Sequence, residues 1–161
     1  MISMDTKQVK ELTGLTDNQI TYLIKKVDAL KREKSQGKAR EYTFRELVYL
    51  KLASLMRSDG LGLDEINQAV GTLNYFWKIK EFTGSGALTK HHEGAWAFSP
   101  PSDFLNDGEF LYINANGEVA KKRSLTDHIP GVYYNVMAIT KGLSKDDQME
   151  LDLMSEEMAV R

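Results

Sequence analysis

The stretch MDTKQVKELTGLTDNQITYLIKKVDAL, residues 4–30, decides how the first part of the chain folds. Asp5 and Thr16 are each followed three residues later by a glutamine, which is the capping-box pattern of a helix start. Gly14 lies between the two patterns and can adopt the left-handed conformation that ends a helix. The stretch therefore predicts two short helices joined by a tight turn, which together form a helix-turn-helix.

The second of these helices has an apolar side and a polar side. Its apolar residues recur at helical spacing and are predicted to face the core: Ile20, Leu23, Ile24 and Val27. A helix that reads DNA presents polar side chains to base edges in the major groove, while its apolar side holds it to the core. The residues suited to that task here are Asn18, Gln19, Thr21 and Lys25.

A basic loop follows in KREKSQGKAREYTFREL, residues 31–47. Gly37 permits a tight turn, and Thr43 with Glu46 forms a third capping box that begins another helix. Cations on both sides of the glycine suit phosphate, which positions a protein on DNA without reading its sequence. These cations are Arg32, Lys34, Lys38 and Arg40. The alternative is an ordinary solvated surface loop.

Charge is divided unevenly along the chain. Residues 7–57 carry 12 Lys and Arg against 6 Asp and Glu, whereas residues 58–161 carry 9 against 16. This division favours an anion-binding module joined to an acidic remainder.

The composition excludes several classes of protein. Apolar residues make up 42% of the chain, enough for a packed core. The sequence has no Cys, which excludes disulfides and thiolate metal sites. No apolar run approaches the roughly 18 residues of a transmembrane helix, and no signal peptide is recognised. We therefore expect a cytoplasmic protein with no membrane partner.

Residues 5–70 resemble the DNA-binding domain of MerR-type transcriptional regulators. Four motifs carry the resemblance in order: VKELTGLT (9–16), QITYLIKK (19–26), GKAREYTFREL (37–47) and GLGLDEI (60–66). The resemblance implies a winged helix-turn-helix that works as a dimer on inverted-repeat DNA. It also implies that Gly37 is the turn of the wing and that Tyr22 and Arg40 contact phosphates.

The sequence departs from the family pattern within the second helix. Thr21 stands where the family has arginine, and Leu23 stands where it has a second tyrosine. The base-reading pattern of the family is therefore not carried over. The predicted DNA-binding set is Thr16, Asn18, Gln19, Thr21, Tyr22, Lys25, Lys26, Arg32, Lys34, Lys38 and Arg40.

The chain is predicted to be an α+β protein with two domains, residues 1–82 and residues 83–161. The first ends in a helix with a heptad-like seam, a candidate dimerisation helix: Ile66, Val70, Leu73, Trp77 and Lys80. The segment TGSGAL, residues 83–88, is the predicted flexible boundary. The second domain is predicted to be a small antiparallel sheet with a C-terminal helix: a strand in 95–101, a hairpin over 109–122 that turns at Asn116-Gly117, a strand in 131–139 and a helix from Ser144.

No pattern of catalytic or metal-binding residues is found. His91, His92 and Glu93 are adjacent, and neighbours on an extended strand point to opposite sides, so they do not form a metal site. We expect no enzymatic activity, no cofactor and no metal. The dense aromatic residues of the second half suit core packing, with a ligand pocket or a dimer interface as alternatives.

Three functions fit these features. The first is a homodimeric, sequence-specific transcriptional regulator of the nucleoid that binds double-stranded DNA. Its C-terminal half would supply dimerisation and leaves open a small-molecule or protein effector. Repression is favoured because the long coiled-coil helix of the family's activators is at most modest here. The second is a phage or plasmid accessory factor for excision or segregation, and the third is an antitoxin-like protein-interaction module suggested by the acidic C-terminal half.

Overall fold

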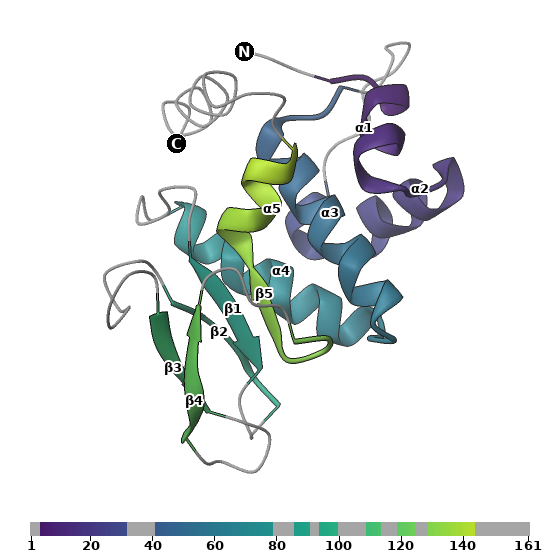
Figure 1. Cartoon of the computed structure of the whole chain (residues 1–161). Helices are drawn as coiled ribbons and strands as arrows, with labels where there is room; N and C mark the ends of the chain where they lie inside the picture. The colour runs from purple at the N-terminus through teal and green to yellow at the C-terminus, as the bar shows by residue number, and fades with distance from the viewer. Residues whose placement is uncertain are drawn as a thin grey trace.

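The computed structural model describes residues 4–31, 41–78, 86–90, 94–99, 109–113, 119–124 and 129–143. The helices in chain order are α1 (Thr6–Thr13), α2 (Asp17–Lys26), the 3-10 turn η1 (Asp28–Leu30), α3 (Phe44–Ser58), α4 (Leu63–Lys78) and α5 (Val136–Leu143). The strands are β1 (Ala87–Lys90), β2 (Trp96–Ser99), β3 (Glu109–Ile113), β4 (Val119–Ser124) and β5 (Tyr133–Asn135). Figure 1 shows α1 and α2 at one side of the molecule and the strands at the other, with α3 and α4 between them. The predicted α+β class is confirmed.

The first three helices begin where the capping boxes predict. At α1, the Asp5 carboxylate accepts from the backbone N–H of Gln8 at 2.8 Å, and the Gln8 side chain accepts from the backbone N–H of Asp5 at 3.0 Å. The same reciprocal pair starts α2 at Thr16 and α3 at Thr43. Each box satisfies two N–H groups that a helix end would otherwise leave without a partner.

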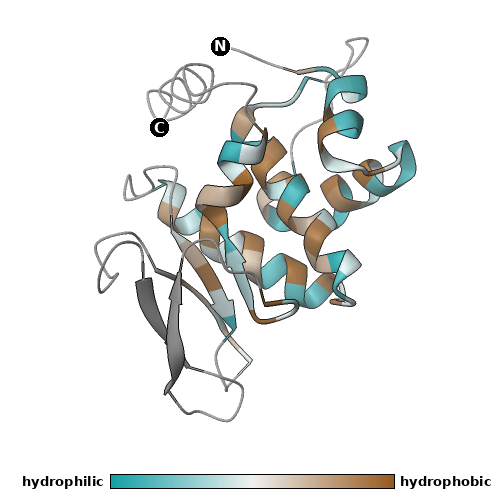
Figure 2. Ribbon diagram, viewed as in Figure 1, coloured by the Kyte–Doolittle hydropathy of each residue, from teal (hydrophilic) through white to brown (hydrophobic). Residues whose placement is uncertain are grey.

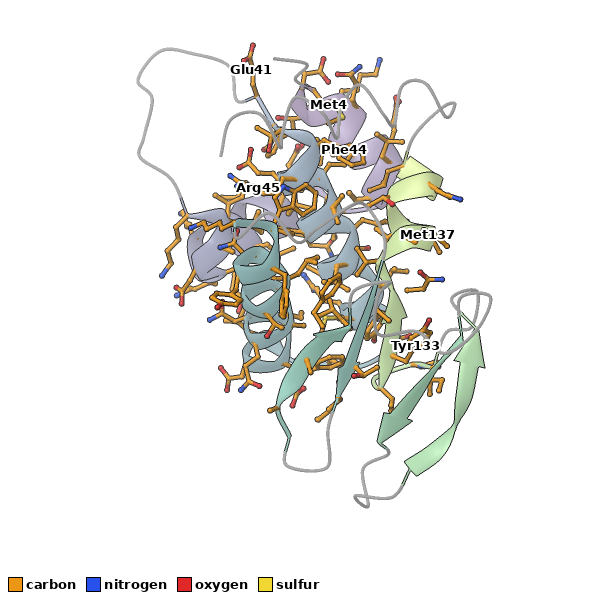
Figure 3. All side chains as sticks on the ribbon, turned by 90° about the vertical axis from the view of Figure 1, so that its left-hand side faces the viewer. Met4, Glu41, Phe44, Arg45, Tyr133 and Met137 are labelled. Atoms are coloured by element: carbon orange, nitrogen blue, oxygen red, sulfur yellow. The ribbon has the colours of Figure 1, made fainter. Side chains whose placement is uncertain are left out.

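Helix α3 forms the centre of the helical layer. It is buried on most of its circumference, as expected of a helix surrounded by other elements. Helices α1, α2, α4 and α5 all contact it. Hydrophobic residues run along α3 and α4 in Figure 2, whereas the outer turns of α1 and α2 are largely hydrophilic. Met4 and Phe44 are buried in this core near the start of α3 (Figure 3).

Three short strands form an antiparallel sheet in the order β2-β1-β5. Leu88 on the central strand is paired with Phe98 on one side and with Tyr134 on the other. All three residues belong to the same hydrophobic core as the helices. Strand β2 packs on α4, and helix α5 packs on α3. The sheet therefore completes one core that extends across the predicted boundary between residues 82 and 83.

Helix α4 turns its predicted seam toward this core. Four of the five seam residues are almost fully buried within the chain: Ile66, Val70, Leu73 and Trp77. The ring of Trp77 meets the ring of Tyr49 edge-on, with centroids 5.9 Å apart. The fifth residue, Lys80, lies outside the described residues. A dimer contact through α4 would therefore use side chains other than these four.

Two predictions for the second half need correction. The strand predicted over 131–139 ends at Asn135, and α5 begins at Val136. The Asn135 side chain accepts from the backbone N–H of Ala138 at 3.1 Å, so it caps the new helix in the manner of an N-cap asparagine. The predicted flexible boundary 83–88 also extends too far, because Ala87 begins the central strand of the sheet.

Other predictions for this half are confirmed or lie outside the description. Strand β2 falls within the predicted 95–101 segment. Strands β3 and β4 form the predicted antiparallel hairpin. The Asn116-Gly117 turn and the helix from Ser144 lie outside the described residues. Among the helices of the described ranges, none combines the length and apolar character needed to cross a bilayer.

Candidate nucleic-acid interface

The turn between α1 and α2 is held by a buried threonine. The Thr13 hydroxyl donates to the Val9 carbonyl at 2.7 Å and accepts from the backbone N–H of Leu15 at 3.2 Å. The Thr13 carbonyl accepts from the hydroxyl of Ser54 on α3 at 2.9 Å. Gly14 takes the left-handed conformation with φ of 74°. These bonds fix the turn and attach it to the central helix.

A surface ion pair spans the same turn. Lys10 Nζ on α1 lies 3.1 Å from Asp17 Oδ2 at the start of α2. Both side chains are largely exposed, so the pair adds little stability by itself. The pair matters more for the charge of this surface, because Lys10 partly neutralises the Asp17 carboxylate, which would otherwise repel phosphate.

Helix α2 separates its residues as the sequence predicts. Ile20, Leu23 and Ile24 are buried against the core. The predicted DNA-binding residues Asn18, Thr21, Tyr22 and Lys25 are all exposed. They are spaced three and four residues apart, which places them along one side of the helix. We call these four residues the α2 stripe.

Tyr22 gives the stripe an aromatic centre. Its side chain is 45% exposed, whereas the tyrosines of the core are almost fully buried. Neighbouring stripe positions are neutral or cationic, and none is a carboxylate. The carboxylates nearest in sequence are Asp17 and Asp28, and each lies beside a lysine. Hydrogen bonds from Lys31 and Asn67 hold the pKa of Asp28 below its usual range.

Thr16 and Gln19 hold the start of α2. The Thr16 hydroxyl accepts from the backbone N–H of Gln19 at 3.2 Å, and Gln19 Oε1 accepts from the backbone N–H of Thr16 at 2.9 Å. The amide nitrogen of Gln19 takes no part in this cap. Thr16 and Gln19 therefore cap the helix, and they also lie at the edge of the α2 stripe. Lys26 is exposed at the other end of the helix.

The predicted wing lies between two anchored ends. Arg32, Lys34, Gly37, Lys38 and Arg40 lie outside the described residues. Before them, η1 ends at Leu30, which is buried. After them, Tyr42 forms an antiparallel bridge with Met4, with N–O distances of 2.9 and 3.0 Å. The described residues on both sides of the basic segment are thus held to the helix-turn-helix.

A groove beside α2 adds one residue that sequence reasoning missed. Its volume is about 430 Å³, and it runs between α2 and the turn that joins α3 to α4. Asn18 and Tyr22 line one side, and Arg57 lines the other. Arg57 is exposed in the last turn of α3. No sequence pattern indicates this proximity, because a basic residue in a last helical turn is already explained by the helix dipole.

No cluster of three His, Asp or Glu side chains is present among the described residues. His91, His92 and Glu93 lie outside them.

No curated protein matches the sequence significantly. A family model described as "MerR HTH family regulatory protein" matches residues 4–72. These residues run from the Met4–Tyr42 bridge through most of α4, so they include α2 and the groove beside it. The resemblance seen in the four sequence motifs is therefore confirmed. Residues 4–72 of this chain are thus similar to the MerR-type helix-turn-helix domain of regulatory proteins.

Proposed function

We propose that the chain is a sequence-specific transcriptional regulator that binds double-stranded DNA as a homodimer at an inverted repeat. The observation that carries the proposal is the α2 stripe: four polar, aromatic or cationic residues exposed on the second helix of a MerR-type domain. The role is binding rather than catalysis, and its place would be the nucleoid in the cytoplasm.

The α2 stripe is the proposed base-reading element. An α-helix fits the major groove of B-DNA, where each base pair presents a distinct set of donors and acceptors. The amide of Asn18, the hydroxyl of Thr21 and the ammonium of Lys25 provide donors and acceptors for those edges. Their side chains extend from a helix held rigidly by its buried residues, which is the support that specific recognition needs.

The cations around this helix are the proposed phosphate contacts. Arg57 borders the groove, Lys26 lies at the end of α2, and the wing cations follow in sequence. Contacts to phosphate supply affinity that falls steeply with salt and is the same for every sequence. Tyr22 has a hydroxyl that suits a phosphate as well.

Dimerisation and repression are the finer parts of the proposal. An inverted repeat calls for two copies of the domain related by a two-fold axis. Only residues 79–86 separate the end of α4 from β1, too few for the long helix of the family's activators. This short connection supports repression, with the C-terminal half supplying the dimer contact and a site for a small-molecule or protein effector.

Selection of binding sites from random double-stranded DNA tests the proposal directly. We expect the full chain to enrich one inverted repeat, to protect it in a footprint, and to lower transcription from a promoter that contains it. A protein that enriches no sequence would contradict the proposal. Cooperative spreading over tandem sites without an effect on transcription would indicate a DNA-coating accessory factor instead.

A further inference from the structure

Two sets of polar contacts join the sheet to the two ends of the α3–α4 turn. At the end of α3, Asp59 Oδ2 accepts a 2.5 Å hydrogen bond from the hydroxyl of Tyr134 on β5. At the start of α4, Glu65 Oε1 lies 2.8 Å from Lys90 Nζ on β1, and Glu65 Oε2 accepts from Trp96 Nε1 on β2 at 2.8 Å. All three strands of the sheet therefore contact a residue that flanks the turn: β5 reaches Asp59, and β1 and β2 reach Glu65. We call these five residues the sheet clamp.

The aromatic members of the clamp are buried and in contact with each other. Tyr134 is 1% exposed and Trp96 is 6% exposed, with ring centroids 5.8 Å apart. The Tyr134 hydroxyl also accepts from the backbone N–H of Gly131 at 3.0 Å. Bonds at buried sites are costly to break, because the groups left behind lose their partners. The bonds of Tyr134 and Trp96 are therefore the ones that would cost most to break.

The ionisation states of the clamp suit these bonds at neutral pH. Burial and the hydrogen bond to Asp59 raise the pKa of Tyr134, so its hydroxyl stays protonated and can donate. The hydrogen bond from Lys90 holds the pKa of Glu65 below its usual value, so its carboxylate stays charged and can accept twice.

The segment held by the clamp is the wall of the groove beside the α2 stripe. Leu61, Gly62 and Leu63 line that groove together with Arg57 and Tyr22. The turn carrying them begins at one clamp residue and ends shortly before another. Gly131, in the turn that precedes β5, also lies close to it, since a β-carbon built there would be 3.8 Å from Leu61 Cδ2.

We propose that the sheet clamp positions the α3–α4 turn against α2, so that the C-terminal half sets the DNA affinity of the N-terminal domain. The clamp residues touch no DNA in this scheme. They are positioning residues that hold Arg57 and the wall of the groove at a fixed place relative to Tyr22. The effect on DNA affinity rests on the proposed DNA-binding function, whereas the positioning of the turn does not.

The test uses the full chain with Tyr134→Phe and Glu65→Gln, which remove a hydroxyl and a charge with little change of shape. Tyr75→Phe and Asp64→Asn are matched controls, because Tyr75 and Asp64 are exposed on the same helix as Glu65. Ile139→Val, in the core at α5, controls for a general loss of stability. All proteins are assayed well below their unfolding temperatures.

Two measurements are made on each protein. The first is the dissociation constant for the selected operator at several salt concentrations. We expect each clamp variant to bind about fivefold more weakly, with the same dependence on salt as the wild type, because no phosphate contact is removed. The second is the backbone amide NMR spectrum without DNA. We expect the resonances of Arg57, Leu61 and Tyr22 to move in the clamp variants and to stay in place in all three controls.

The outcomes separate the clamp from the proposed function. Clamp variants that bind the operator like the wild type, or that leave the three resonances in place, would overturn the proposal that the clamp positions the turn. A wild type that selects no operator would overturn the proposed function, and the amide spectra would still decide whether the clamp positions the turn.

Discussion

Helices α2 and α4 border the same groove but use their polar residues differently. Among the described residues, the side chains of the α2 stripe are exposed and none is held by a hydrogen bond to another part of the fold. On α4, by contrast, Glu65 bonds to two strands, Asn67 bonds to Asp28, and Asn74 accepts from Tyr49. One helix is available for a ligand, whereas the other holds the molecule together.

The difference shows how one scaffold supports two tasks. Both helices bury an apolar side, so burial alone does not distinguish them. The polar positions distinguish them, because a recognition surface needs unsatisfied donors and acceptors that a partner can meet. A structural helix instead satisfies its polar side chains with hydrogen bonds inside the protein. Substitutions of these α4 residues should therefore lower stability, whereas substitutions of the α2 stripe should change binding and leave stability intact.

The largest effect is expected from Trp77→Ala on α4. Trp77 is fully buried in the core that the helices and the sheet share, so its truncation leaves a cavity there. We expect the free energy of unfolding to fall by about 3–5 kcal/mol, measured by denaturant titration. Helix and sheet signals should be lost together. Two separate transitions would show that the sheet unfolds independently of the helices.

Arg57→Ala should weaken DNA binding while leaving the fold intact. Arg57 is exposed at the groove, so its loss removes a proposed phosphate contact and little packing. We expect about fivefold weaker binding to all sequences alike, and a slope of log affinity against log salt reduced by about 0.9.

Lys78→Ala is the matched control for this change, since Lys78 is an exposed cation in the last turn of α4. It should bind like the wild type. Equal losses of affinity in the two variants would mean that only net charge matters and that the groove has no special role.

Glu65→Gln should lower stability in a way that depends on pH. The pKa of Glu65 is lower in the folded chain than its ordinary value of 4.5, so its contribution is present above that pH. The contribution is lost as the pH falls through the folded pKa. We expect the variant to be less stable by about 1–2 kcal/mol at pH 7.

The check for Glu65 is the free energy of unfolding of wild type and variant between pH 7 and pH 3. The difference between them should be constant down to about pH 5 and should shrink below it. Asp64→Asn is the matched control, because Asp64 is an exposed carboxylate one residue away. If the difference in free energy of unfolding did not change with pH, the charge of Glu65 would not be the source of the stabilisation.

The smallest effect is expected from Lys10→Met. Its ion pair with Asp17 is exposed on both sides, and such pairs contribute roughly 0.5 kcal/mol. Thermal unfolding at low and high salt measures this, and the difference between variant and wild type should vanish at high salt. A large loss at high salt would show that the methylene stem of Lys10 packs on the turn.

The helical part of the fold could be predicted because its signals are local. Asp5, Thr16 and Thr43 each begin a helix through a partner three residues away, and Gly14 ends one through its own conformation. The division of α2 into a buried and an exposed side follows from helical spacing alone. No distant contact is needed to read these features.

The sheet and the groove depend on contacts between residues far apart in sequence. Residues 131–139 have the β-branched and aromatic character of a strand, yet the Asn135 cap starts a helix within them. The proximity of Arg57 to Tyr22 and the bond between Asp59 and Tyr134 follow from how the helices and the sheet pack. A pattern along one segment carries no information about such packing.

The most direct test of the account is to compare the preferred DNA sequences of the wild type, of Thr21→Ala and of Arg57→Ala by selection from the same random pool. Thr21 lies on the exposed stripe of α2, and Arg57 lies across the groove. We expect Thr21→Ala to change or relax the preferred base at one position in each half-site. We expect Arg57→Ala to keep the wild-type preference at lower affinity. An unchanged preference in Thr21→Ala together with a changed preference in Arg57→Ala would contradict the assignment of sequence reading to α2.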